Sequence, residues 1–222
     1  MAIFVTGTGT DVGKTLFCSM LLTKYGREFN LKYLKPIQTG TVQDSDIIKV
    51  KLLSQLHDSH FLPHEYHFAK PASPHYASEL EFRSVDTIQL AEKYKKILEE
   101  SIILEGAGGL FVPLNSTTLT IDVLKKVKFP TILVCHSGLG TINHTLLSIE
   151  ALLTREIPLL GFYFIGEKND ISQNNIYTIE SFSKVKFLGQ SFIPDTIREG
   201  KTFLPFVDKY FDTNGVIKSL LK

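Results

Sequence analysis

Residues 5–16 read VTGTGTDVGKTL, and this stretch ends like a phosphate-binding loop. The general loop of this kind has the spacing G-x-x-x-x-G-K-[ST]. Here Thr8 stands where that spacing requires a glycine, and Gly7 lies one residue too far upstream. The loop is one residue longer than the general motif. It is either a nucleotide site with an extended loop or a glycine-rich turn without chemical function.

The flanking segments favour the nucleotide site. Residues 2–6 (AIFVT) are typical of a buried strand, and a helix is expected from residue 14 to about residue 25. A loop between strand and helix lets backbone N–H groups surround phosphate oxygens. We expect Lys14 to reach the terminal phosphates and the Thr15 hydroxyl to bind magnesium.

The rest of the chain alternates short apolar runs with segments of helical period. Strands are expected at 31–36, 101–105, 131–135, 159–165 and 185–189, and helices at 46–56, 85–100, 119–127, 140–155, 171–183 and near the C-terminus. Residues 57–80 are expected to be rich in loops. Continuous apolar strands separated by helices predict a mostly parallel sheet. We therefore expect one α/β domain over residues 1–222, of the P-loop NTPase type, with helices on both faces of the sheet.

Composition narrows the class of protein. The 222 residues include 24 basic and 23 acidic side chains, so the formal net charge of +1 indicates neither a nucleic-acid nor a membrane partner. No apolar run approaches the length of a membrane span, and the first residues lack the features of a signal peptide. The two cysteines, Cys18 and Cys135, lie in apolar surroundings typical of buried thiols. A cytoplasmic location is expected.

Three charged residues are expected near the loop. Glu105 ends an apolar run and precedes GAGG, and a carboxylate at the end of a parallel strand lies in the ligand crevice. The alternative for Glu105 is an exposed position in a tight turn. Lys35 also follows an apolar run, where a cation can hold a phosphoryl group, with Thr39 as a neutral donor nearby. Asp46 is either a magnesium ligand or a helix N-cap, and residue type alone favours the cap.

Six motifs, in order over roughly residues 1–165, together resemble the dethiobiotin synthetase family. They are VTGTGTDVGKT (5–15), KPIQTG (35–40), SD (45–46), PASPH (71–75), EGAGGLFVPL (105–114) and LGTINHT (139–145). Any one of them alone would be weak evidence. The family's loop carries the same extra residue before GKT, so the resemblance also accounts for the unusual spacing.

The resemblance implies an ATP- and Mg2+-dependent ring closure. In that reaction one amine of 7,8-diaminopelargonate takes up CO2 to form a carbamate. The carbamate attacks the γ-phosphate of ATP and gives a carbamic–phosphoric anhydride. The second amine then closes the ureido ring, and ADP and phosphate are released.

The resemblance also implies roles for individual residues. Magnesium would be bound by Thr15, Asp46 and Glu105, and the catalytic residues would be Lys35, Lys14 and Thr10. Nucleotide contacts would come from Asp11, Val12, Gly13, Lys14, Thr15, Leu16, Asp46, Glu105, Gly106, Ala107 and Gly108. Thr39 would contact the diamine. The substrate's carboxylate tail would bind Gly140, Thr141, Ile142 and Asn143 of a partner subunit, which implies a homodimer with composite sites.

The sequence departs from the family at the base-reading position. The family's strand ends there in an asparagine, whereas this chain has Ile165 and Gly166. Asn169 follows several residues later. Either the loop brings Asn169 to the base or base specificity is relaxed, and we favour relaxed specificity.

Two other hypotheses are weaker. His57, His60, His64 and His67 are either a transition-metal site or parts of a solvated loop, and the reaction implied above needs only an oxygen-bound cation. A partitioning ATPase of the ParA or MinD type is the alternative function, but its loop carries a second, earlier lysine that this loop lacks.

Overall fold

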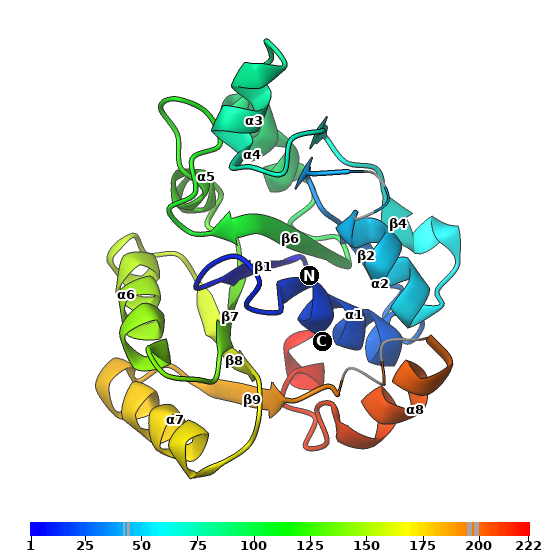
Figure 1. The fold of residues 1–222 in the computed structure, drawn as a ribbon, viewed down its shortest axis with the longest axis vertical. Coiled ribbons are helices and arrows are strands. Elements are labelled where there is room, and N and C mark those ends of the chain that lie inside the picture. The colour runs from blue at the N-terminus through cyan, green and yellow to red at the C-terminus, as the bar shows by residue number, and fades with distance from the viewer. Residues whose placement is uncertain (42, 44, 195–196, 198–199) are drawn as a thin grey trace.

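The computed structural model describes residues 1–222 except 42, 44, 195–196 and 198–199 (Figure 1). Its main sheet has the strand order β4-β2-β6-β1-β7-β8-β9. Every neighbouring pair in it is parallel. The strands are β1 (Ile3–Gly7), β2 (Lys32–Leu34), β4 (Phe61–Leu62), β6 (Ile102–Gly109), β7 (Thr131–His136), β8 (Leu159–Ile165) and β9 (Phe187–Ser191). A second sheet pairs β3 (Ile37–Thr39) with β5 (Tyr66–Phe68).

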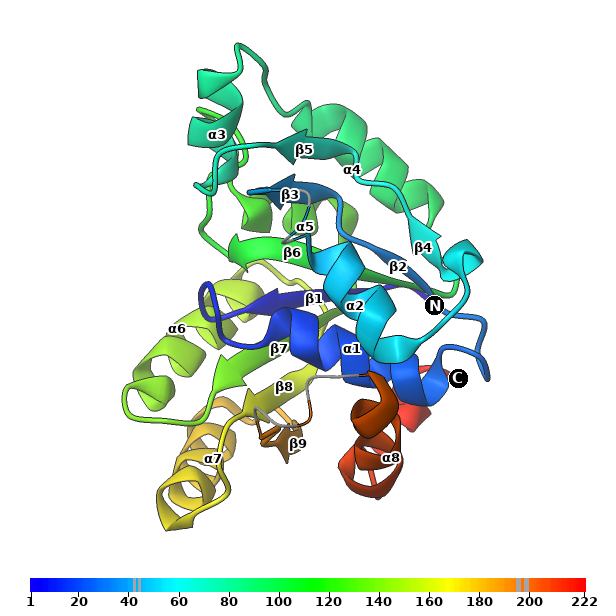
Figure 2. The same ribbon diagram turned by 45° about the vertical axis from the view of Figure 1, so that its right-hand side comes forward.

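Helices cover both faces of the main sheet. The helices are α1 (Lys14–Tyr25), α2 (Asp46–Ser54), α3 (Pro74–Leu80), α4 (Thr87–Lys96), α5 (Thr120–Val127), α6 (Thr141–Thr154), α7 (Asp170–Ser183) and α8 (Gly200–Tyr210). Figure 2 shows α1 and α2 on one face, where α8 packs against them. Helices α4 to α7 contribute to the two hydrophobic clusters of the other face. The predicted mostly parallel α/β fold is therefore confirmed.

The alternating direction of side chains along each strand explains why both faces of the main sheet are apolar. In β1, Ile3 and Val5 belong to the cluster with α1, whereas Phe4 belongs to the cluster with α4 and α5. Successive side chains of a strand point to opposite faces, so a strand between two helical layers must be apolar throughout.

No helix within the described residues combines the length and the apolar character needed to cross a membrane.

The strand of Glu105 is longer than predicted. We expected it to end at residue 105, but β6 continues to Gly109 because Val5 pairs with Glu105 and Gly7 pairs with Gly109. Glu105 consequently lies inside the strand with no exposed surface. The alternative of a solvent-exposed glutamate in a turn is wrong.

The predicted strand 31–36 is divided, and the predicted loop region 57–80 is more regular than expected. The ladder of β2 stops at Leu34, before Pro36, which has no backbone N–H to donate. The chain then leaves the main sheet and forms β3. Residues 57–80 contain the 3-10 helix η1 (Asp58–His60), both β4 and β5, and α3. A further 3-10 helix, η3 (Lys218–Leu220), lies near the C-terminus.

The phosphate-binding loop connects β1 to α1 through a left-handed residue. Gly13, immediately before α1, has φ +96°, a conformation that side chains disfavour. A Cβ atom added there would lie 2.7 Å from Cγ1 of Ile165 at the end of β8. The loop is thus packed against the end of a strand two positions away in the sheet.

We expect Gly13→Ala to lower the free energy of unfolding by about 1–3 kcal/mol, because the methyl group adds backbone strain and a clash. Gly9→Ala is the matched control in the same loop: its Cβ would meet only Val12, at 4.0 Å, and its φ is not positive. The control should stay within about 1 kcal/mol of wild type. Urea unfolding of the three proteins measures the difference, and equal losses for both variants would contradict this account.

Candidate nucleotide- and metal-binding site

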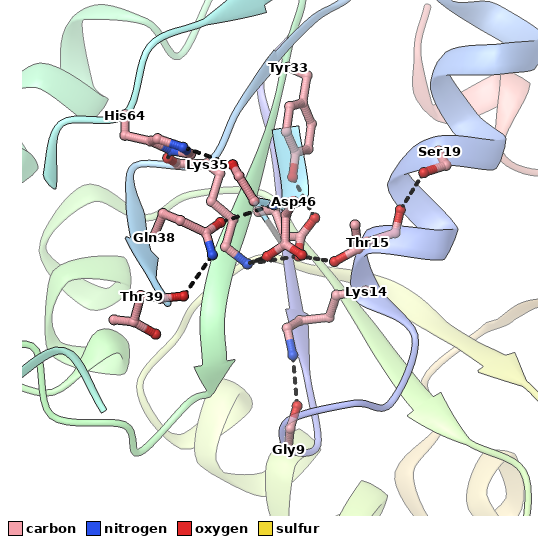
Figure 3. A network of polar contacts seen from close by, with 12 residues as sticks. Gly9, Lys14, Thr15, Ser19, Tyr33, Lys35, Gln38, Thr39, Asp46 and His64 are labelled. Atoms are coloured by element: carbon pink, nitrogen blue, oxygen red, sulfur yellow. Dashed lines mark hydrogen bonds and ion pairs between the residues drawn. The ribbon is translucent and has the colours of Figure 1, made fainter. Parts of the chain in front are cut away.

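Four segments bring charged side chains together at the carboxyl edge of the sheet (Figure 3). Lys14 and Thr15 begin α1, Lys35 follows β2, Glu105 lies in β6 and Asp46 begins α2. Strands β2, β6 and β1 are adjacent, so residues at their carboxyl ends meet in one crevice. The predicted residues Lys14, Thr15, Lys35, Asp46 and Glu105 are therefore neighbours in space.

Glu105 is at the centre of this group. Its Oε1 accepts a hydrogen bond from the Thr15 hydroxyl at 2.7 Å and one from Lys35 Nζ at 3.0 Å. Its Oε2 accepts a hydrogen bond from the Tyr33 hydroxyl at 2.7 Å. Both carboxylate oxygens thus have donors, as a buried charge requires.

Lys35 links the two carboxylates. Its ammonium forms ion pairs with Glu105 and with Asp46, and the residue is only 5% exposed. Burial by itself would lower the pKa of Lys35, but the charges of Glu105 and Asp46 outweigh it and raise the pKa above its usual range. Burial is the largest single influence on Asp46 and by itself would raise its pKa, but the charge and hydrogen bond of Lys35, together with Lys49 and Thr15, bring the pKa below its ordinary value. The pair is charged at neutral pH.

Lys14 is folded back onto its own loop. Its Nζ donates a hydrogen bond to the Gly9 carbonyl at 2.7 Å, and the side chain is buried. Burial is the largest cause that lowers the pKa of Lys14. An ammonium held by one neutral carbonyl can exchange that partner for a phosphate oxygen, which is a stronger, charged acceptor.

Asp46 is not a cap residue. It is the first residue of α2, preceded by Ser45 at the N-cap position, and its carboxylate is paired with Lys35. Its backbone N–H donates instead to Oε1 of Gln38 at 3.1 Å, while Gln38 Nε2 donates to the Thr39 carbonyl at 2.8 Å. The cap alternative for Asp46 is wrong, and Gln38 connects the start of α2 to the corner that carries Thr39.

The oxygen atoms here suit a hard divalent cation. Thr15, Asp46 and Glu105 supply a hydroxyl and two carboxylates, and oxygen donors are what Mg2+ prefers. No group of three or more histidine, cysteine or acidic side chains within the described residues is placed to hold a metal. Magnesium commonly completes its coordination with water and substrate phosphates, so a set with two carboxylates fits it.

The four histidines do not form a metal site within the described part of the chain. His60 Nδ1, His64 Nδ1 and His67 Nε2 lie 2.7, 2.8 and 2.8 Å from the carbonyl oxygens of Leu31, Lys35 and Gly40. A carbonyl only accepts, so each of these nitrogens donates. The histidines attach segment 60–67 to the segment that carries Lys35 and Thr39.

The remaining loop residues surround the same crevice. Thr10 and Asp11 are exposed, and a Cβ added at Gly108 would lie 3.6 Å from Thr10 Oγ1, so β6 ends beside the loop. The other predicted nucleotide contacts are buried or half-buried: Val12, Gly13, Leu16, Gly106 and Ala107.

The predicted carboxylate-binding residues lie elsewhere. Gly140 precedes α6, which follows β7, whereas Lys35 follows β2 on the opposite side of β1. Thr141 is buried with its hydroxyl on Thr145 at 3.2 Å, Ile142 is half-buried and Asn143 is exposed. Among the described residues, no hydrogen bond or ion pair joins this segment to Lys35, Asp46 or Glu105 of the same chain.

The segment expected at the nucleotide base is held by its own contacts. Asn169 caps α7, with its Oδ1 accepting from the Ser172 N–H at 2.9 Å. Gln190 Nε2 donates to the carbonyls of Gly166 and Glu167 at 3.1 and 2.7 Å. Asn169 is therefore occupied as a helix cap in this structure.

Sequence comparison identifies close relatives of the whole chain. A family model described as an AAA domain matches residues 1–195. The ATP-dependent dethiobiotin synthetase BioD of Leptospira interrogans is 46% identical over 222 residues, covering 100% of both chains. The enzyme of the same name from Afipia carboxidovorans is 44% identical over 165 residues, covering 74% of this chain and 76% of the relative.

Comparison of structures gives the fold alone. A ParA family ATPase from Chlorobium tepidum has a TM-score of 0.61 over 99% of this chain and 97% of that chain, with 10% sequence identity. Chloroplast FtsY from Physcomitrella patens has a TM-score of 0.52 over 93% of this chain and 65% of that chain. The ParA-like alternative therefore retains only a structural resemblance.

We expect Asp46→Asn to lower the free energy of unfolding of the metal-free protein by about 2 kcal/mol near neutral pH, because Lys35 loses a charged partner. The pKa of Asp46 is lowered in the folded state, so its contribution is present above the ordinary value of 3.8 and is lost as the pH falls through the folded pKa. The difference between wild type and variant should accordingly shrink at about pH 3.

Urea unfolding in EDTA at both pH values measures this. Asp58→Asn is the control, because it removes a different lysine–carboxylate pair, that of Asp58 with Lys51. The Asp58 side chain is 74% exposed, so water screens this pair. It should change stability little at either pH. A deficit of D46N that stays constant down to acid pH would contradict the charge pairing.

Proposed function

Since the chain belongs to the family of ATP-dependent dethiobiotin synthetases, which are ATP-dependent ligases, we propose that the crevice around Lys35 is where it closes the ureido ring of dethiobiotin. The observation that carries the proposal is the position of the Lys35 ammonium between the carboxylates of Asp46 and Glu105, beside the loop with Lys14. Cations and oxygen ligands converge there, as phosphoryl transfer requires.

The substrates are 7,8-diaminopelargonate, CO2 and ATP. The carbamate formed on one amine attacks the γ-phosphorus of ATP and displaces ADP. Lys14 and Lys35 stabilise the negative charge of the phosphoryl group during this step, and Thr10 lines the loop beside the reacting atoms. The second amine attacks the carbonyl carbon of the resulting anhydride, and phosphate leaves.

Thr15, Asp46 and Glu105 are the residues that would hold Mg2+, which would neutralise phosphate charge when bound. The Lys35 ammonium has three N–H donors, so it can donate to a phosphate oxygen while it stays paired with its two carboxylates. The backbone N–H groups of the loop and of the start of α1 bind phosphate oxygens, and Thr39 contacts the diamine.

The proposed active unit is a cytoplasmic homodimer. Gly140 precedes α6 and Thr141 to Asn143 begin it, and the N–H groups at the start of a helix suit the carboxylate tail of the diamine. In the same chain this helix start lies on the opposite side of β1 from Lys35. A second copy of the chain can supply them. Each site would then combine Lys35 of one chain with Asn143 of the other.

The first test is dethiobiotin formation from 7,8-diaminopelargonate, bicarbonate and magnesium with ATP, GTP or CTP. We expect product with all three nucleotides, because the base-reading asparagine is missing and Asn169 caps α7. Product with ATP alone would mean that another group selects the base. Folded protein that binds ATP but forms no product would refute the ligase assignment.

Mixed dimers test the composite site. Lys35→Met and Asn143→Asp should each inactivate a homodimer at low diamine concentration, the second by repelling the substrate carboxylate. When equal amounts of the two variants are mixed and their subunits exchange freely, half of the dimers are heterodimers. Each heterodimer has one intact site. About a quarter of wild-type activity should return on mixing. No recovery, with exchange verified by mass, would mean that each site lies within one chain.

A further inference from the structure

Tyr33 donates a hydrogen bond to Glu105 that sequence reasoning did not identify. It lies in β2 with no exposed surface, and its ring packs edge-on against Phe61 at a centroid distance of 6.3 Å. Tyr33 is in register with Ile103, so Glu105, two residues further along β6, shares its face of the sheet. The phenol ring extends toward Glu105 from this diagonal position.

The two oxygens of Glu105 have different kinds of partner. Oε1 accepts hydrogen bonds from Thr15 and Lys35, the groups that we assign to metal and phosphate, whereas Oε2 accepts one from the Tyr33 hydroxyl at 2.7 Å. The buried Cys18 thiol also neighbours this carboxylate. In Figure 3 the Tyr33 hydroxyl points into the centre of the network. One oxygen is thus directed at the ligand site and the other is anchored in the core.

Simple packing does not account for the hydroxyl. A phenylalanine would fill almost the same apolar space, whereas a buried hydroxyl requires a hydrogen-bond partner. The partner here is a carboxylate without exposed surface, for which a donor on each oxygen is a strong requirement.

Tyr33 also differs from Lys35 and Thr15 in having no second partner at the ligand site. Lys35 is assigned to the phosphoryl group, and Thr15 is itself an expected metal ligand. The Tyr33 hydroxyl has no such second function and donates to Glu105. It can hold the carboxylate in place while the contacts of Oε1 change.

We propose that Tyr33 is a positioning residue for metal binding, whose hydroxyl fixes Oε2 of Glu105 so that Oε1 stays directed at the site. The inference rests on the proposed function, because Glu105 is assigned there as a magnesium ligand. Hydrogen bonds to a ligating carboxylate orient it, and their loss typically weakens metal affinity ten- to a hundredfold. Tyr33 acts through Glu105 and does not itself touch substrate.

Tyr33→Phe tests this, since it removes only the hydroxyl. The direct measurement is Mn2+ binding to the protein in the presence of ADP, followed by electron paramagnetic resonance, which requires neither diamine nor turnover. We expect the dissociation constant for Mn2+ to rise about tenfold or more. In the ligase assay the half-saturating Mg2+ concentration should rise similarly, while kcat at saturating Mg2+ should change much less.

Tyr163→Phe is the matched control. Tyr163 is 1% exposed, belongs to the same apolar cluster, and its hydroxyl contacts Ser191 at 2.6 Å, away from the site. The Tyr163→Phe variant should bind Mn2+ with wild-type affinity, even if its melting temperature falls as much as that of Y33F. Wild-type Mn2+ affinity in Y33F, or an equal loss in both variants, would overturn the inference.

A Y33F chain that no longer folds would also overturn it, because the hydroxyl would then maintain the core rather than the ligand. The binding measurement separates this inference from the proposed function. If wild type binds Mn2+ with ADP and Y33F does so weakly, the positioning stands even where no dethiobiotin is formed.

Discussion

The charge of Glu105 constrains the whole site. A carboxylate without exposed surface is tolerated only where donors and cations replace the water it has lost. Glu105 obtains them from Thr15, Lys35 and Tyr33, which lie 90, 70 and 72 residues away in the chain. The start of α1 and the end of β2 must therefore both reach β6 before the charge is satisfied. The same contacts place the groups that we assign to phosphoryl transfer.

The burial of the Glu105 carboxylate depends on strand pairing. Because β6 pairs with β1 as far as Gly109, Glu105 is inside the sheet rather than at its rim. Strand β2 ends earlier, and after Pro36 the chain forms β3, which pairs with β5 in a second sheet. Lys35 lies in the chain between β2 and β3 and forms an ion pair with Glu105. His64 and His67 secure this arrangement by donating to the carbonyls of Lys35 and Gly40.

The fold and the chemistry are separable in this protein. A ParA family ATPase shares the architecture over nearly its whole length at 10% identity, so the frame of sheet and loop does not specify a reaction. The candidate site of this chain is built from the charges around the loop. Lys35 connects Asp46 and Glu105; it follows β2, whereas Asp46 begins α2 and Glu105 lies in β6.

The sequence by itself determined the class of fold and predicted most residues that the structure brings together in the candidate site. Continuous apolar strands predicted the parallel sheet, and the motifs around Lys14, Lys35 and Glu105 predicted the crevice, because these signals are local. Tertiary structure decided the length of β6, the pairing of Asp46 with Lys35 instead of a helix cap, and the contact of Tyr33 with Glu105. Each of these depends on which strands are neighbours and in what register, and no short stretch of sequence records that. A tyrosine in an apolar strand has the pattern of a core residue until the neighbouring strand places a buried carboxylate beside its hydroxyl.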